Sequence, residues 1–136
     1  MIKLIIGAKG TGKTKNLIEL VNSAAGSSNG SVICIEKGDK LNYDVTYKAR
    51  LIDTKSFSVE DGHALYGFVA GIAASDHDIT NIFIDSALKI CANDTEAFAT
   101  FVDEIAKLAE TYHFDCVMTV SSAPEALPVE LKKYID

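Results

Sequence analysis

The chain has 136 residues, of which 48% are hydrophobic and 24% are charged. This length suits one domain with one core over residues 1–136, and the composition excludes disordered, collagen-like and mucin-like chains. Thirteen lysines and arginines against nineteen aspartates and glutamates leave a net charge of -6, which argues against a protein that coats nucleic acid. No stretch is apolar enough to span a bilayer, so no membrane partner is expected.

The amino-terminal residues carry no recognisable signal peptide. Met1, Ile2 and Lys3 run directly into a short apolar segment and then into glycine, without a cleavage site, which predicts a cytoplasmic protein. The three cysteines are widely spaced and contain no C-x-x-C pair, so neither a disulfide framework nor a zinc cluster is expected.

Apolar runs and helical periodicity alternate along the chain. Strands are predicted at residues 2–6, 31–36, 49–54, 79–85 and 114–120. Helices are predicted at residues 13–25, 58–72, 93–112 and 129–134, the second opened by a capping box of Ser58 and Asp61. Because most of these strands are apolar throughout, they predict a mainly parallel sheet of four to five strands in a three-layer α/β/α fold.

A glycine-rich turn follows the first predicted strand. It spells Gly7-Ala8-Lys9-Gly10-Thr11-Gly12-Lys13-Thr14, the full G-x-x-x-x-G-K-[ST] pattern, and Lys15 follows it directly. The glycines allow the backbone to point successive N–H groups at one place, and the helix that follows adds positive potential there. Residues 7–15 are therefore predicted to bind the phosphates of a nucleotide.

On this motif the chain resembles the P-loop NTPases. The resemblance implies that Lys13 reaches the β- and γ-phosphates of ATP and that the Thr14 hydroxyl is a ligand of Mg²⁺. It also implies a second acidic residue near the metal, at the end of another strand. The apolar run 79–84 followed by Asp85 is similar to that element, so Asp85 is predicted to be the second metal ligand.

Two branches of the P-loop proteins fit the sequence poorly. Translational-type GTPases place a glycine three residues after this aspartate, whereas residues 85–88 read Asp-Ser-Ala-Leu, and no Asn-Lys-x-Asp motif follows the final strand. Small-molecule and nucleoside kinases generally use several lid arginines, but Arg50 is the only arginine beside twelve lysines.

The RecA-like branch fits better. Its acidic strand commonly ends in Asp-Ser, as at Asp85 and Ser86, and its water-orienting glutamate ends the neighbouring second strand, as Glu36 does here. The branch also places a sensor strand between the strand before the glycine-rich loop and the acidic strand. The run 114–120 resembles that strand, with Thr119 or Ser121 as the polar contact to the γ-phosphate or to water.

The resemblance predicts an ATP-binding protein with slow Mg²⁺-dependent hydrolysis, in which Lys13, Glu36 and Ser121 are catalytic. Since one arginine makes a finger within the chain difficult, a protein partner or self-association is expected to supply a cation. A nucleotide-dependent switch without useful hydrolysis is the alternative, and a small-molecule or nucleoside kinase is a third reading. Tyr43 and Tyr47 are candidates for stacking on the base.

Overall fold

The computed structural model describes residues 1–136, with five strands, four α-helices and three 3₁₀ helices. The strands are β1 (Ile2–Gly7), β2 (Ser31–Glu36), β3 (Arg50–Asp53), β4 (Ile79–Ile84) and β5 (Asp115–Ser121). The α-helices are α1 (Lys13–Ser27), α2 (Gly62–Ser75), α3 (Ala87–Ile90) and α4 (Thr95–Tyr112). The 3₁₀ helices are η1 (Thr54–Phe57), η2 (Pro124–Ala126) and η3 (Val129–Tyr134). No helix combines the length and the apolar character that crossing a membrane requires.

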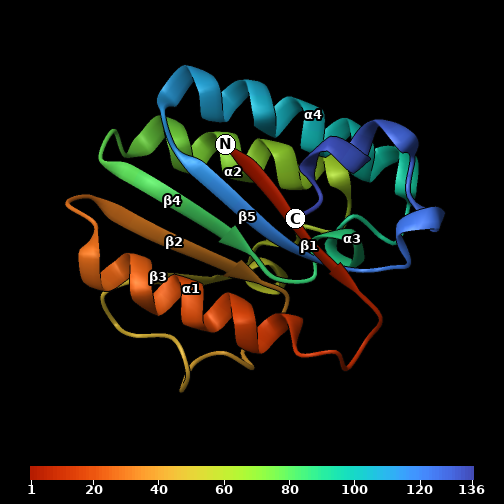
Figure 1. The fold of residues 1–136 in the computed structure, drawn as a ribbon. Coiled ribbons are helices and arrows are strands. Elements are labelled where there is room, and N and C mark those ends of the chain that lie inside the picture. The colour runs from red at the N-terminus through yellow and green to blue at the C-terminus, as the bar shows by residue number, and fades with distance from the viewer.

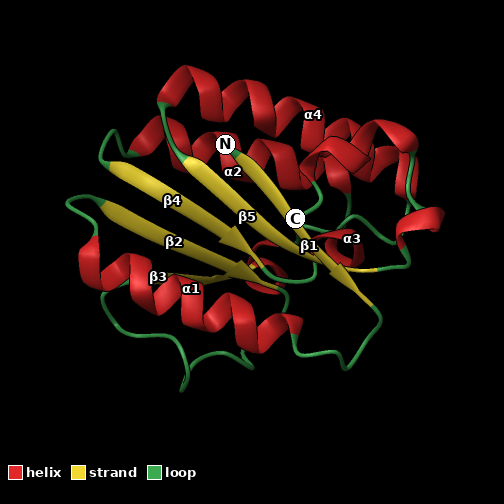
Figure 2. Ribbon diagram, viewed as in Figure 1, coloured by secondary structure: helices red, strands yellow, loops and turns green.

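All strand pairs in the sheet are parallel, and the strand order is β1-β5-β4-β2-β3. Helix α1 covers one face, and α2 and α4 cover the other (Figure 1). The predicted three-layer α/β/α class is therefore confirmed. The final strand also lies where the sequence predicted, between β1 and β4. Because the strands are parallel, their carboxyl ends share one edge of the sheet, and the loops that follow the arrowheads in Figure 2 lie along that edge.

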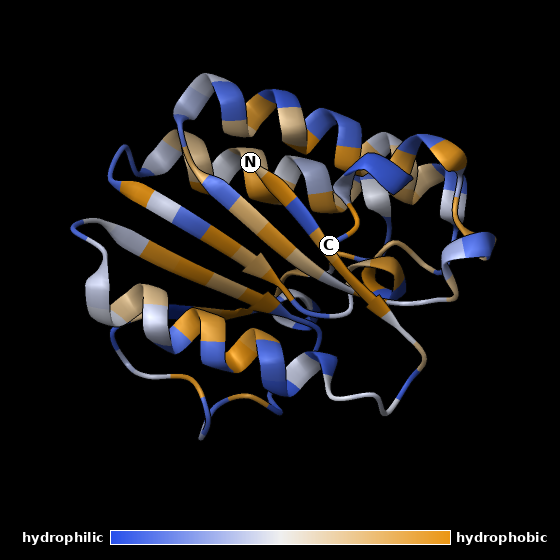
Figure 3. Cartoon of the chain, viewed as in Figure 1, coloured by the Kyte–Doolittle hydropathy of each residue, from blue (hydrophilic) through white to orange (hydrophobic).

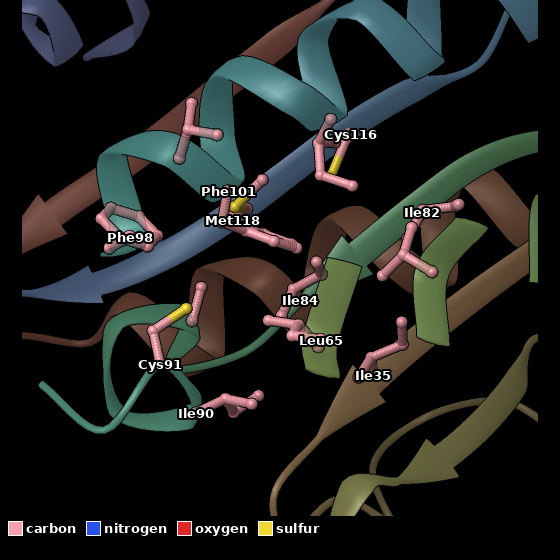
Figure 4. Packing of buried hydrophobic residues seen from close by; sticks show 14 of the residues in the cluster. Ile35, Leu65, Ile82, Ile84, Ile90, Cys91, Phe98, Phe101, Cys116 and Met118 are labelled. Carbon is pink, nitrogen blue, oxygen red and sulfur yellow. The ribbon is translucent and has the colours of Figure 1, made fainter. Parts of the chain in front are cut away.

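Alternate residues of each strand face opposite layers. Ile35, Ile84 and Met118 belong to the larger core on the side of α2 and α4, where Phe98 and Phe101 of α4 fill the space (Figure 4). Cys34, Phe83 and Val117, which directly precede these three residues on their strands, belong to a smaller core beneath α1. The strands are apolar along most of their length in Figure 3, as expected when both faces are covered.

Four details differ from the sequence prediction. The second helix does not begin at Ser58, which has a φ of 56° and ends η1; it begins at Gly62, and the Asp61 side chain accepts the N–H of Ala64. Helix α1 continues past Gly26 to Ser27, and the tail helix is 3₁₀ rather than α. The short helix α3 was not predicted.

The free edge of β1 is covered by the end of the chain. Ile135 forms a parallel bridge with Leu4, and the N–H of Asp136 donates to the Leu4 carbonyl at 3.1 Å. An edge strand exposes unpaired backbone groups, and this short pairing covers part of that edge.

Candidate functional site

The glycine-rich loop joins the carboxyl end of β1 to the first turn of α1. Gly10 and Gly12 have φ values of +85° and +84°, a region that side chains with a Cβ rarely adopt. At Gly7 space is the constraint, because a Cβ there would lie 2.7 Å from the Thr11 hydroxyl. The backbone conformation thus favours glycine at positions 10 and 12, and the position of the Thr11 side chain favours it at position 7.

The loop closes on one of its own carbonyl groups. The Thr11 hydroxyl and the Lys13 ammonium group both donate to the Ala8 carbonyl oxygen, each at 2.7 Å. A carbonyl oxygen carries less negative charge than a phosphate oxygen, so an anion at the helix end would compete for the Lys13 hydrogen bond.

Thr14 meets Asp85 although 71 residues separate them. The Thr14 hydroxyl donates to Oδ1 of Asp85 at 3.1 Å, and the Thr119 hydroxyl donates to the same oxygen at 2.7 Å. The Thr119 oxygen in turn accepts the N–H of Ser86 at 2.7 Å. Thr119 is only 1% exposed, so a buried hydrogen bond fixes the position of the Asp85 carboxylate.

Strand alternation explains why these polar groups gather on one face. On the side of α1, three strands carry a polar residue two positions after a core residue, at or near the carboxyl end of the strand. These pairs are Cys34 and Glu36 on β2, Phe83 and Asp85 at the end of β4, and Val117 and Thr119 on β5. Ser121 continues the same face of β5 and is exposed.

The donor set at the end of β4 fits Mg²⁺. A hydroxyl and a carboxylate are oxygen ligands of the kind Mg²⁺ prefers, and this ion is usually held by one or two carboxylates together with substrate phosphates and water. No group of three or more histidine, cysteine or acidic side chains could hold a metal ion by itself. Thr14 and Asp85 would therefore complete a metal site only together with an anionic ligand.

Glu36 lies beside Asp85 in the sheet but is turned to its own loop. The N–H of Asp85 donates to the Ile35 carbonyl at 2.8 Å, which fixes the two strand ends side by side. The Glu36 carboxylate accepts the N–H of Leu41 at 3.2 Å and is 3% exposed. Burial raises the pKa of Glu36, and the hydrogen bond from Leu41 opposes that rise.

A cleft of about 540 Å³ lies at this edge of the sheet. Its lining comes from the glycine-rich loop, from the loop after β2, from the segment after β4 and from the end of β5. The lining residues are Lys9, Gly10, Gly12, Lys13, Thr14, Lys15, Lys40, Leu41, Asp85, Ser86, Leu88, Lys89, Asn93, Thr119 and Ser121.

Most of the predicted site residues meet in this cleft. Six of the nine loop positions line it, together with Asp85 and Ser121, whereas Gly7, Ala8, Thr11 and Glu36 do not. Tyr43 and Tyr47, proposed to stack on a base, are 100% and 91% exposed and are also absent from the lining.

Two lysines of the cleft were not predicted. Lys40 follows β2 in a segment without periodicity, and Lys89 lies on the unpredicted helix α3. No local pattern marks either lysine. Thr119 was named only as an alternative to Ser121, although its place on the same strand face as Val117 is a signal that the sequence contains.

The sequence matches no known protein-family model, and no curated protein matches it significantly. The function is therefore inferred from the residues that meet in the cleft.

Proposed function

We propose that this protein binds the Mg²⁺ complex of ATP in the cleft and hydrolyses it slowly, as a minimal RecA-like ATPase of the cytoplasm. The observation that carries the proposal is the contact of Thr14 with Asp85 at the mouth of the glycine-rich loop. A chance glycine-rich turn does not require a carboxylate from the end of a distant strand beside the hydroxyl that follows its lysine.

The loop and α1 would hold the phosphates. Backbone N–H groups of residues 10–14 and the amino end of a 15-residue helix supply positive potential without a charged side chain. Lys13 would exchange the Ala8 carbonyl for a phosphate oxygen, which is the stronger acceptor.

Thr14 and Asp85 would hold Mg²⁺ through one hydroxyl and one carboxylate oxygen. The ion, when bound, neutralises charge on the phosphate oxygens. Thr119 keeps the Asp85 carboxylate in place through its 2.7 Å hydrogen bond. The remaining metal ligands would be phosphate oxygens and water, in keeping with the small protein donor set.

Glu36 is the proposed water-orienting group, and Ser121 is the proposed polar contact to the γ-phosphate or that water. Glu36 does not line the cleft and one of its carboxylate oxygens accepts the Leu41 N–H, so its side chain would have to turn to reach water in the cleft. This requirement supports slow turnover.

The hydrogen bond between Glu36 and the Leu41 N–H favours a second candidate, a nucleotide-dependent switch without useful hydrolysis. If the Glu36 carboxylate stays on the Leu41 N–H, nothing in the lining except Asp85 offers a carboxylate to water. Binding of ATP and ADP would then differ in effect without turnover.

Calorimetry with ATP, ADP and a non-hydrolysable ATP analogue, combined with phosphate release, tests both candidates. We expect the wild type to bind all three, Lys13→Ala to bind none, and Glu36→Gln to bind ATP while losing phosphate release. Equal phosphate release by wild type and Glu36→Gln would remove Glu36 from the chemistry. Binding by the wild type with no release at all would favour the switch.

A further inference from the structure

Five lysines face the cleft, and one carboxylate accompanies them. Lys9, Lys13 and Lys15 belong to the glycine-rich loop and its helix, whereas Lys40 and Lys89 come from the loops after β2 and β4. The three ion pairs of the structure lie elsewhere, so none of these lysines has a carboxylate oxygen within 4.0 Å.

This gathering of cations stands out in a chain whose net charge is -6. Like charges brought together repel one another, and none of these lysines forms an ion pair that would offset the repulsion. A bound polyanion would offset it. The three lysines of the loop side are part of the predicted phosphate motif, but Lys40 and Lys89 are additional and approach from other strands.

Both additional lysines belong to segments that lie beside Asp85. Lys89 lies four residues after Asp85, and its segment is anchored where the Ser86 N–H meets the Thr119 hydroxyl. Lys40 precedes Leu41, whose N–H is held by the Glu36 carboxylate at 3.2 Å. Both lysines are exposed and are therefore free to reorient toward a ligand.

The single arginine cannot take this place within the chain. Arg50 begins β3, the strand at the far edge of the sheet, and lies at the amino end of that strand. It lines a separate groove with Ser31, which begins β2. The amino and carboxyl ends of parallel strands lie on opposite sides of the sheet, so Arg50 is far from the cleft at the carboxyl ends.

We propose that Lys40 and Lys89 form a pair of cations within the chain that binds the terminal phosphate of the nucleoside triphosphate and so distinguishes ATP from ADP. This inference rests on the proposed function. It replaces the cation that the sequence led us to expect from a partner or from self-association. Lys13 would contact the β- and γ-phosphates, whereas Lys40 and Lys89 would contact only the terminal phosphate, which ADP lacks.

Dissociation constants of Mg²⁺-ATP and Mg²⁺-ADP test the pair in Lys40→Met, Lys89→Met and Lys89→Arg. Charge-assisted hydrogen bonds are worth enough that each Met variant should lose about tenfold or more in ATP affinity. ADP affinity should change by less than about twofold, because ADP lacks the contacted group. Lys89→Arg should keep most of the wild-type ATP affinity, since the positive charge remains.

Lys37→Met is the matched control, because Lys37 is an exposed lysine of the same loop outside the cleft lining. It should bind both nucleotides like the wild type. Thermal unfolding of each variant checks that it is folded, which is expected for changes at exposed side chains.

The outcomes separate this inference from the proposed function. If both Met variants keep the wild-type ratio of ATP to ADP affinity, the lysine pair is wrong, while the loss of both nucleotides in Lys13→Ala would still support the proposed function. If the wild type binds neither nucleotide, the proposed function itself fails, and the inference with it. A preference for ATP that grows with protein concentration would assign the cation to self-association and would also overturn the pair.

Discussion

The two ends of the parallel sheet are built differently. At the carboxyl end, five lysines without ion-pair partners surround an open cleft of about 540 Å³. At the amino end, Gly30 packs against the Asp78 carbonyl, and the amino group of Met1 lies 3.3 Å from Asp115.

On the proposed function, the difference separates residues that stabilise the fold from residues that would bind a ligand. At the amino end the distinguishing features are the close backbone packing at Gly30 and the ion pair of Met1 with Asp115. At the carboxyl end the unneutralised lysines are a cost to the fold that a bound anion would remove. Substitutions at the amino end should therefore change stability and leave nucleotide binding intact, while those at the carboxyl end should change binding.

The largest expected effect is at Gly30, near the amino end. A Cβ at this position would lie 2.0 Å from the backbone oxygen of Asp78, so Gly30→Ala must displace backbone. We expect a loss of about 3 kcal/mol or more in the free energy of unfolding, measured by urea denaturation. Gly67→Ala is the control: nothing lies within 4 Å of that added Cβ, and the helix should gain up to about 1 kcal/mol.

If Gly30→Ala proved as stable as the wild type, the close packing of the amino end would be refuted. Its residual folded fraction should bind ATP with wild-type affinity, which calorimetry at low temperature can measure. Loss of binding by protein that is still folded would contradict the separation of the two ends.

The next largest effect is expected at Thr119, because its buried hydroxyl binds both Asp85 and the Ser86 N–H. Thr119→Val keeps the shape but leaves the Ser86 N–H without its partner and removes one donor from Asp85. An unsatisfied buried polar group costs about 1–3 kcal/mol, so we expect a loss of that size together with weaker Mg²⁺ dependence of ATP binding. Thr119→Ser retains the hydroxyl and should lose less than about 1 kcal/mol.

A smaller, pH-dependent effect on stability is expected at Glu36. Burial raises the pKa of Glu36, so the folded state binds this proton more tightly than the unfolded state does. Stability is therefore lost as the pH rises through the raised pKa, and the cost is absent below the ordinary glutamate pKa. Glu36→Gln keeps an oxygen for the Leu41 N–H and removes the charge, so it should be more stable than the wild type at neutral pH.

Thermal unfolding from acidic to neutral pH measures this difference. The melting temperatures of the two proteins should converge in acid. As the pH rises through the raised pKa of Glu36, the melting temperature of the variant should exceed that of the wild type. A constant difference at every pH would show that the charge of Glu36 is not its cause.

The smallest effect is expected at Asp115. Its ion pair with the Met1 amino group is exposed, with 60% and 52% of the two side chains accessible. Such pairs are worth about 0.2–1 kcal/mol and weaken with salt, so Asp115→Asn should cost less than about 0.5 kcal/mol in low salt. ATP binding should not change. A large loss would mean that the amino end depends on this charge rather than on packing.

The sequence predicted the local parts of the site well. The glycine-rich loop, β1 and α1 are contiguous, so spacing alone describes them. Asp85 was found because an apolar strand precedes it, and its contact with Thr14 follows from the parallel order of the strands. The alternation of side chains along β5 also predicts that Thr119 lies on the same face.

The remaining parts depend on how distant segments pack. Helix α3 spans four residues and is preceded by Ser86 at a φ of 54°, a conformation that no local preference predicts for serine. Lys40 lies in a segment without periodicity, and its place at the cleft depends on the pairing of β2 with β4. Likewise, the pattern of Ser58 and Asp61 resembled a capping box, but only Asp61 caps α2.

The pairing of β1 constrains how the chain is made. β1 is an edge strand whose only sheet neighbour is β5, so residues 2–7 pair with residues 116–121. During synthesis β1 and the glycine-rich loop are made before β5, so this strand has no neighbour in the sheet until β2, β3, β4 and β5 have all followed. Such long-range parallel pairing folds slowly and leaves apolar segments exposed meanwhile. A chain terminated before β5 would carry the complete motif and no site.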